Sequence, residues 1–193
     1  LRRNPKIYRR EAEALARRMA GSAETAPALQ SITDIKAGNK TFLGATVIGA
    51  TANIQDIRDV RVDQGRFFTE EENRRSRPVA VIGRDLVDEL FPYQDPLGKQ
   101  IRIRGVPFTV IGTEEKQGAS FALSLDRNVW IPLPSYEKIW GSRLSVTVYQ
   151  KPRDRALFAE TQDAARASLR AMRRLRPRAG DNFDLLMPEA GRS

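Results

Sequence analysis

Apolar residues recur at helical spacing near both ends of the chain. Asn4 and Pro5 form a helix-start signal, and Ile7, Leu15 and Met19 follow as an apolar stripe. Toward the other end, Asp154 is placed to cap a long helix that carries apolar residues along one side. We predict helices over 5–20, 85–91, 136–140 and 155–175, with a short turn after Thr69.

Between these helices the pattern changes to β-branched residues and to alternation with a period of two. Ile101 and Ile103 alternate with polar residues, and Gly38-Asn39-Lys40 separates two runs of strand-like composition. We predict strands over 29–37, 41–51, 79–82, 100–104, 108–111, 129–131, 144–148 and 181–186.

This order of elements predicts an α+β protein with two lobes. The end pieces hold too few strands to cover their own helices, so they are expected to share one discontinuous α/β lobe made of 1–68 and 142–193. Residues 69–141 then form an inserted lobe that is rich in β-strands. The chain shows no internal repeat and no low-complexity linker.

The composition excludes several kinds of chemistry. The chain contains no cysteine and no histidine, which excludes disulfides, Cys/His zinc sites, cysteine nucleophiles and triads with an imidazole base. Its longest uncharged run, 41–55, is interrupted by glycine and asparagine and is shorter than the ~20 apolar residues of a spanning helix. We expect an excised piece whose native ends are tethered in a longer protein.

The net charge of +9 comes from excess arginine and is compatible with nucleic acid, an anionic membrane surface or a solvated basic face. The arginines at the end of the last predicted helix also complement the helix dipole, and no aromatic residues are interleaved with them as stacking platforms. We favour a solvated or membrane-facing role for this cluster. Its members are Arg166, Arg170, Arg173, Arg174, Arg176 and Arg178.

The acidic and glycine motifs have structural explanations. Glu70, Glu71 and Glu72 lie in a first helical turn, where negative charge is favourable, and the spacing of Asp85 and Glu89 occurs on many solvated helices. Gly98-Lys99 lacks the upstream glycine and the following serine or threonine of a phosphate-binding loop. We therefore predict no catalytic, cofactor-binding or metal-binding residues, no cofactor and no enzyme activity in this chain.

Two aromatic residues have different expected environments. Trp130 lies within a strand and is expected in the core. Phe121 lies in a loop of small residues with Ala119, Ala122 and Leu123, where an exposed side chain would indicate a contact patch. Packing of Phe121 against its own loop is the simpler interpretation of the sequence.

Six short motifs follow one another in the middle of the chain and together resemble a known family. They are Gly65-Arg66-Phe67-Phe68, Val79-Ala80-Val81-Ile82-Gly83, Leu90-Phe91-Pro92, Asp95-Pro96-Leu97-Gly98-Lys99, Phe108-Thr109-Val110-Ile111-Gly112 and Trp130-Ile131-Pro132-Leu133. Their order and spacing resemble the periplasmic core domain of the MacB/FtsX-like permeases over residues 49–141, while the rest of the chain agrees in element order only.

The resemblance implies a porter-like lobe and an inserted lobe called Sabre. It implies an extracytoplasmic, periplasmic domain of an inner-membrane ABC transporter permease, joined to transmembrane helices and paired with a cytoplasmic ATPase in a homo- or heterodimer. Such a domain would couple ATP hydrolysis to conformational change and would contact an adaptor or substrate protein. Alone, it is expected to be monomeric.

Two alternatives from other functional classes remain open at this stage. A basic soluble domain could bind nucleic acid or another anionic polymer, although the leading interpretation expects no nucleic-acid partner. A carboxylate-based glycan hydrolase would need two carboxylates facing one cleft at ~5 to ~10 Å.

Overall fold

The computed structural model describes residues 7–121, 123–172 and 185–186. The chain divides into two compact units. Unit 1 contains Leu1–Ala28, Asp56–Arg58 and Arg143–Ser193, and unit 2 contains Leu29–Gln55 and Asp59–Ser142. Each unit mixes helices and strands, which confirms the predicted α+β class.

Unit 1 is a small strand ladder with two α-helices and a short 3₁₀ helix. The first part of β1 (Ala23–Ala37) pairs antiparallel with β10 (Thr147–Pro152), from Ala23 opposite Pro152 to Ala28 opposite Thr147. β10 in turn pairs in parallel with β11 (Leu185–Leu186), which confirms the predicted strand-helix-strand order. Its helices are α1 (Arg9–Arg18), η1 (Arg155–Leu157) and α6 (Phe158–Met172).

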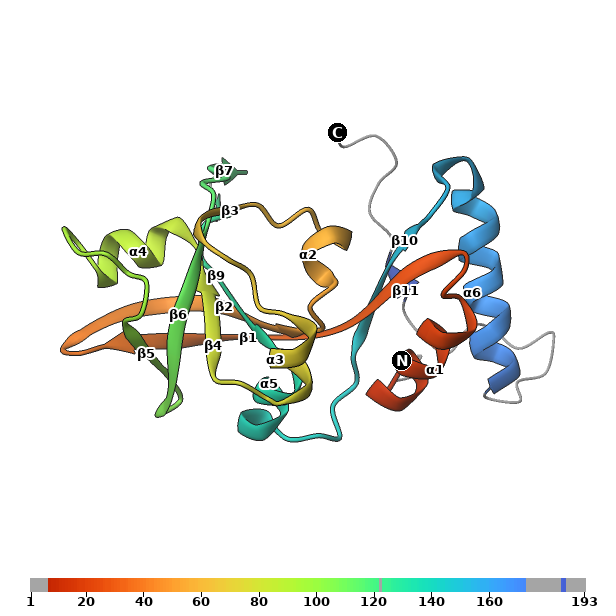
Figure 1. Cartoon of the computed structure of the whole chain (residues 1–193), viewed down its shortest axis with the longest axis horizontal. Helices are drawn as coiled ribbons and strands as arrows, with labels where there is room; N and C mark the ends of the chain where they lie inside the picture. The colour runs from red at the N-terminus through yellow and green to blue at the C-terminus, as the bar shows by residue number, and fades with distance from the viewer. Residues whose placement is uncertain (1–6, 122, 173–184, 187–193) are drawn as a thin grey trace. The chain divides into compact units, whose positions relative to one another are not determined.

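The core of unit 1 follows from the apolar stripes of its helices. Ala12 and Leu15 of α1 and Ala165 and Leu169 of α6 are fully buried, and the two helices lie side by side (Figure 1). Alanine at two of these four positions lets the helix axes approach closely. Asp154 accepts a hydrogen bond from the Ala156 N–H, so it caps η1, and α6 begins one turn later than the predicted start of the long helix at 155.

Unit 2 is built around a mixed sheet. Its strands run in the order β1, β2, β9, β4, β6 and β3, and β5 pairs with both β1 and β6. β2 and β9 are parallel, β4 and β9 are antiparallel, and β4 and β6 are parallel. The strand bounds are β2 Lys40–Ala50, β3 Val62–Gly65, β4 Val79–Ile82, β5 Gln100–Ile103, β6 Val106–Glu114 and β9 Asn128–Pro132.

The helices of unit 2 cover this sheet and complete its core. α5 packs against β2 and β9, and a Cβ atom at Gly49 would collide with the ring of Tyr136, so glycine is needed for this close approach. Trp130 is 2% exposed, which confirms its predicted place in the core. The helix bounds are α3 Glu70–Arg74, α4 Arg84–Leu90 and α5 Leu133–Trp140, and α2, Ile54–Ile57, lies where the chain passes from one unit to the other.

Several element boundaries differ from the sequence predictions. The first helix begins at Arg9, because Ile7 forms a β-bridge with Val146 instead of the first helical turn. β1 begins at Ala23, since pairing with β10 extends it beyond the predicted start at Leu29. Asn4 and Pro5, the four arginines from Arg173 to Arg178 and most of the predicted last strand lie outside the described residues.

The compact units also divide the chain differently from the predicted lobes. The sequence placed 1–68 with the chain ends, whereas 29–55 and 59–68 group with the middle of the chain. The physical reason is strand pairing, because β2 runs alongside β9 and β3 pairs with β6. Long-range pairing of this kind leaves no trace in local periodicity. Within the described part of the chain, none of the helices combines the length and the apolar character needed to cross a membrane.

Candidate protein-interaction surface

A short two-stranded hairpin in unit 2 exposes two large apolar side chains. Its strands are β7 (Ala119–Ser120) and β8 (Leu123–Ser124), which pair antiparallel with each other only. Phe121, at the tip, is 99% exposed and Leu123 is 72% exposed. Burying one such side chain stabilises by about 1.5–3 kcal/mol, so contact of this hairpin with another molecule would be favourable.

Phe121 also has an unfavourable backbone conformation. Its φ is 51°, in the left-handed region that glycine tolerates and a bulky aromatic residue seldom adopts. This conformation costs roughly 1–2 kcal/mol per residue. A residue with a strained backbone and a solvated side chain adds nothing to stability, which favours a role in contact with another molecule.

The base of the hairpin is held by a buried carboxylate, Asp126. It is 3% exposed and accepts hydrogen bonds from the backbone N–H groups of Gln117 (2.6 Å) and Gly118 (3.0 Å). The Leu125 N–H donates to the Gly118 carbonyl at 2.9 Å and closes the base. Charge-assisted bonds to backbone donors are among the stronger hydrogen bonds in proteins. The short hairpin is therefore held firmly at its base although it is exposed at its tip.

A second buried carboxylate, Glu114, connects this base to the core. Its two oxygens accept hydrogen bonds from the Trp130 indole N–H (3.0 Å) and the Gln117 side-chain amide (2.5 Å). Burial raises the pKa of Glu114 above its ordinary value, although the hydrogen bonds from Trp130, Gln117 and Asn128 oppose this shift. Gln117 thus contacts both carboxylates, one through its backbone and one through its side chain.

The same network reaches the start of α4. Asp85 accepts a hydrogen bond from the Ser124 hydroxyl at 2.6 Å, and its own N–H donates to the Asp126 carbonyl at 3.1 Å. A Cβ atom at Gly83 would collide with that same carbonyl, so the close approach of the two segments depends on glycine. These hydrogen bonds, together with that from the Gly83 N–H to the Asn128 carbonyl, join the hairpin, the start of β9 and the first turn of α4 to one another.

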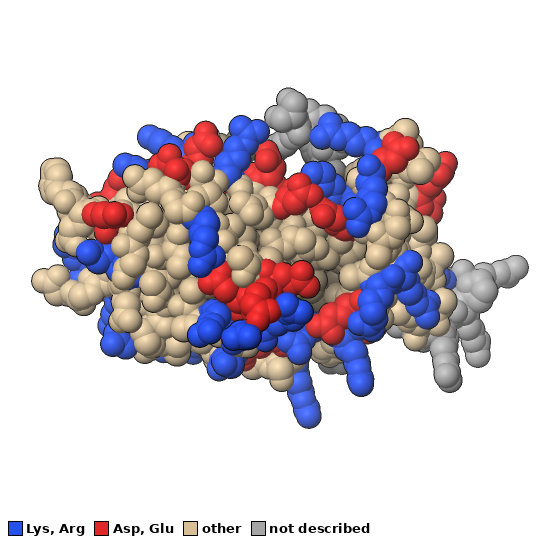
Figure 2. Space-filling view, viewed as in Figure 1, with Lys and Arg blue, Asp and Glu red and all other residues tan. Residues whose placement is uncertain are grey.

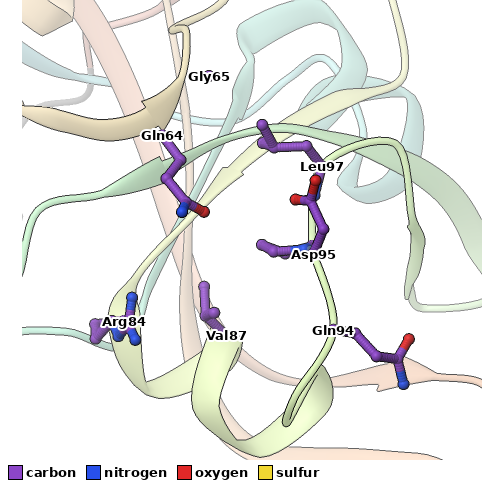
Figure 3. A pocket seen from close by; sticks show the side chains of 8 residues that line it. Gln64, Gly65, Arg84, Val87, Gln94, Asp95 and Leu97 are labelled. Carbon is purple, nitrogen blue, oxygen red and sulfur yellow. The ribbon is translucent and has the colours of Figure 1, made fainter.

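A hollow of about 610 Å³ opens beside α4, where the loop after the helix returns toward β3 (Figure 3). Gln64 and Arg84 lie on one side of it and Asp95 and Leu97 on the other, while Gln94 points away. The size would suit a small molecule. However, Asp95 is the one carboxylate in its lining, so the hollow does not hold the two carboxylates of the hydrolase alternative.

A second hollow lies beside α3, where acidic and basic side chains gather in Figure 2. The guanidinium of Arg66 pairs with Glu72 at 2.6 Å and lowers the pKa of that carboxyl. Arg74 and Arg75 both pair with Glu71. The predicted capping box is present between Thr69 and Glu72, which confirms the structural interpretation of this acidic run.

The structure does not assemble the other residues that the sequence singled out into a reactive site. Asp85 accepts the hydrogen bond from Ser124 of the hairpin, whereas Glu89 is exposed on α4. Gly98 turns the chain with a φ of 81°. Among the described residues there is no group of three or more side chains that could hold a metal ion.

Phe121 was the one contact candidate that the sequence offered, and its exposure favours the contact patch over the simpler interpretation. The sequence missed Asp126 and Glu114, because a carboxylate beside Arg127 or Glu115 has the composition of a solvated loop. No local signal could have identified these residues.

A family model described as the MacB-like periplasmic core domain matches residues 2–168, which is most of the chain and includes this surface. The chain belongs to the family of MacB-like periplasmic core domains. The resemblance inferred from the six central motifs is thereby confirmed, and the match extends well beyond those motifs at both ends.

Curated relatives carry the corresponding name. The chain is 33% identical over 110 residues to the macrolide export ATP-binding/permease protein MacB of Syntrophobacter fumaroxidans, covering 57% of this chain and 15% of that protein. It is 31% identical over 147 residues to the MacB protein of Bdellovibrio bacteriovorus, covering 76% and 22%. The chain therefore spans about a fifth of the length of these relatives.

Solved structures share the fold of this family. The periplasmic region of MacB from Actinobacillus actinomycetemcomitans aligns with a TM-score of 0.75 at 23% identity, covering 89% of this chain and 76% of that chain. The extracellular domain of the transporter YknZ, from Gram-positive bacteria, aligns with a TM-score of 0.74 at 17% identity, covering 89% and 86%. At these identities the likeness concerns the fold alone.

Proposed function

We propose that this MacB-like domain is the extracytoplasmic part of an ABC transporter permease and has no catalytic centre of its own. The match to the family over residues 2–168 carries this proposal. Its relatives are named as export ATP-binding/permease proteins, which supports a position on the periplasmic side of an inner membrane, next to transmembrane helices. ATP hydrolysis would then belong to a cytoplasmic domain or subunit.

In this role the domain couples ATP hydrolysis to movement and to contacts outside the membrane. The porter-like lobe includes both chain ends, which lie in unit 1, and the Sabre-like lobe is the inserted segment 69–141, which lies within unit 2. The firmly held β7–β8 hairpin supplies the contact with an adaptor or substrate protein, because its exposed Phe121 is mounted on the buried carboxylates. Dimerisation is expected through the membrane and ATPase parts of the transporter.

Export by the full-length transporter tests this function. Phe121→Ser in the intact protein, assayed in its native membrane, is expected to reduce export at least tenfold while the amount of transporter in the membrane stays the same. Val106→Ser is the matched control, since Val106 is also exposed in unit 2 but lies at the start of β6, outside the β7–β8 hairpin. Equal export by both variants and the wild type would refute a role for the hairpin.

The nucleic-acid alternative predicts a different result. A basic polymer-binding domain would retain duplex or single-stranded DNA at low ionic strength and release it as salt is added. We expect no retention at any salt concentration, because no aromatic residues are interleaved with the arginine cluster as stacking platforms. Several arginines of the described surface are also paired with carboxylates, as in Arg66–Glu72, Arg74–Glu71 and Arg84–Asp88.

A further inference from the structure

A second strained aromatic residue lies at the opposite end of α4 from the hairpin. Tyr93 is fully exposed and has a φ of 60°, so it repeats the combination found at Phe121. It follows the last helical residue, Leu90, by three positions, whereas Asp85 in the first turn of α4 is bonded to the hairpin. In Figure 2 an uncharged lobe projects at the upper left, where the loop after α4 lies in Figure 1.

The segment made of α4 and the loop after it, residues 84–95, has a net charge opposite in sign to that of the whole chain. Residues 84–95 contain one basic residue, Arg84, and four acidic ones, which gives a net charge of −3 in a chain of net charge +9. Arg84 is itself bound to Asp88 at 3.1 Å and lies 4.0 Å from Asp63. The acidic residues of this segment are Asp85, Asp88, Glu89 and Asp95.

The hollow beside α4 adds a place for a long side chain. It lies next to Tyr93 in the chain, since Gln94, Asp95 and Pro96 all contribute to its wall, and Asp95 supplies its carboxylate. A partner lysine or arginine could lie along Leu97 and end at this carboxylate (Figure 3). We call the surface formed by Phe121, Tyr93, Asp88, Glu89 and this hollow the α4 face.

We infer that the α4 face binds a partner protein through a basic segment of that partner, with Phe121 and Tyr93 as anchors at its two ends. This inference rests on the proposed function and specifies the partner that the hairpin contacts. Exposed aromatic residues dominate the energy of many interfaces, and charged residues around them select the partner and speed the encounter. An anionic lipid surface does not fit, because it would be repelled by Asp88 and Glu89.

The experiment uses the full-length transporter in its native membrane, with the photo-crosslinking residue p-benzoylphenylalanine at position 93 or 121. A control variant carries p-benzoylphenylalanine at position 157, since Leu157 is 42% exposed in unit 1 and lies outside the α4 face. We expect positions 93 and 121, but not 157, to give a protein adduct of the same mass. Mass spectrometry of the cross-linked peptide is expected to show a segment rich in lysine and arginine.

Charge reversal then separates this inference from simple proximity. Asp88→Lys with Glu89→Lys is expected to reduce the adduct at both positions at least fivefold, and so is 0.5 M NaCl. The matched control is Glu160→Lys with Asp163→Lys, which makes the same change of charge on exposed positions of α6 in unit 1 and leaves the adduct unchanged.

The remaining outcomes overturn the inference. They are adducts of lipid mass, adducts of two transporter chains, a cross-linked peptide that is acidic or neutral, an adduct that ignores charge reversal, and no adduct at all. Each of these can occur while Phe121→Ser still reduces export at least tenfold. In that case the proposed function would stand and only the basic partner would be excluded.

Discussion

The two units of this protein differ in how many exposed apolar side chains and strained backbone conformations they contain. Seven of the nine large apolar side chains that are exposed among the described residues belong to unit 2, and so do all five described residues other than glycine with a positive φ. In unit 1 the helices bury their stripes and the strands follow regular pairing. Local rules tend to be broken at functional sites, so this difference supports the proposal that the domain contacts its partner through unit 2.

Steric changes at glycine give the largest expected difference between the units. Gly83→Ala is expected to lower the free energy of unfolding by about 2–4 kcal/mol, because the new methyl group meets the backbone carbonyl of Asp126. Gly21→Ala in unit 1 is the control, since nothing lies within 4 Å of its Cβ position. Chemical denaturation measures both. Similar losses in the two variants would show that unit 2 is not the tighter packed.

Loss of the buried carboxylate that holds the base of the hairpin should produce the next largest effect. Asp126→Ala removes the acceptor of two backbone N–H groups and is expected to cost about 2–3 kcal/mol. Asp154→Ala removes the exposed cap of η1 in unit 1 and should cost about 1 kcal/mol. Hydrogen exchange at Gln117 and Gly118 should accelerate in the first variant only. Unchanged exchange there would mean that Asp126 does not hold the hairpin.

Relief of strain should change stability by less and in the opposite direction. Phe121→Gly and Tyr93→Gly each place glycine where φ is positive and are expected to raise the free energy of unfolding by up to about 1 kcal/mol. Thermal unfolding of the isolated domain provides the measurement. Leu157→Gly, at an exposed position of η1 in unit 1, should instead be destabilising. A loss of stability in all three would remove the argument from strain.

Titration of Glu114 should give the smallest effect. Its pKa is raised in the folded protein, so its contribution to stability is greatest below the ordinary carboxyl pKa and declines as pH rises through the folded-state value. Relative to Glu114→Gln, the wild type should therefore lose stability across this interval and change no further at higher pH. Unfolding curves measured from acid to neutral pH test the sign. A wild type that gains stability relative to the variant would contradict the burial of the charge.

The regular elements were predictable because their patterns are local. The predicted strand over 79–82 is β4, and the stripe of the predicted long helix lies on α6, whose Ala165 and Leu169 are buried. The short strands β7 and β8 were not predicted, since two residues each are too few to show alternation. α2 and β3 were missed for the same reason, and the start of α1 was misplaced because Ile7 pairs with a strand more than a hundred residues away.

The candidate surface was predictable only in part. The loop of small residues around Phe121 drew attention to the hairpin, but the sequence could not show whether that ring is buried or exposed. Tyr93 gave no signal, because a positive φ is a property of the folded backbone. The same holds for Asp126, which is buried by its neighbours in space and not by its neighbours in the chain.

The α+β class, the lack of cysteine and histidine chemistry, and the ordered motifs characteristic of this family can all be derived from the amino-acid sequence. These depend on residue identity and short-range spacing. The folded structure was needed to show where the two units divide, which carboxylates are buried, and that Phe121 and Tyr93 are exposed with a positive φ. Those features arise from contacts between segments far apart in the chain, and local sequence patterns carry no record of such contacts.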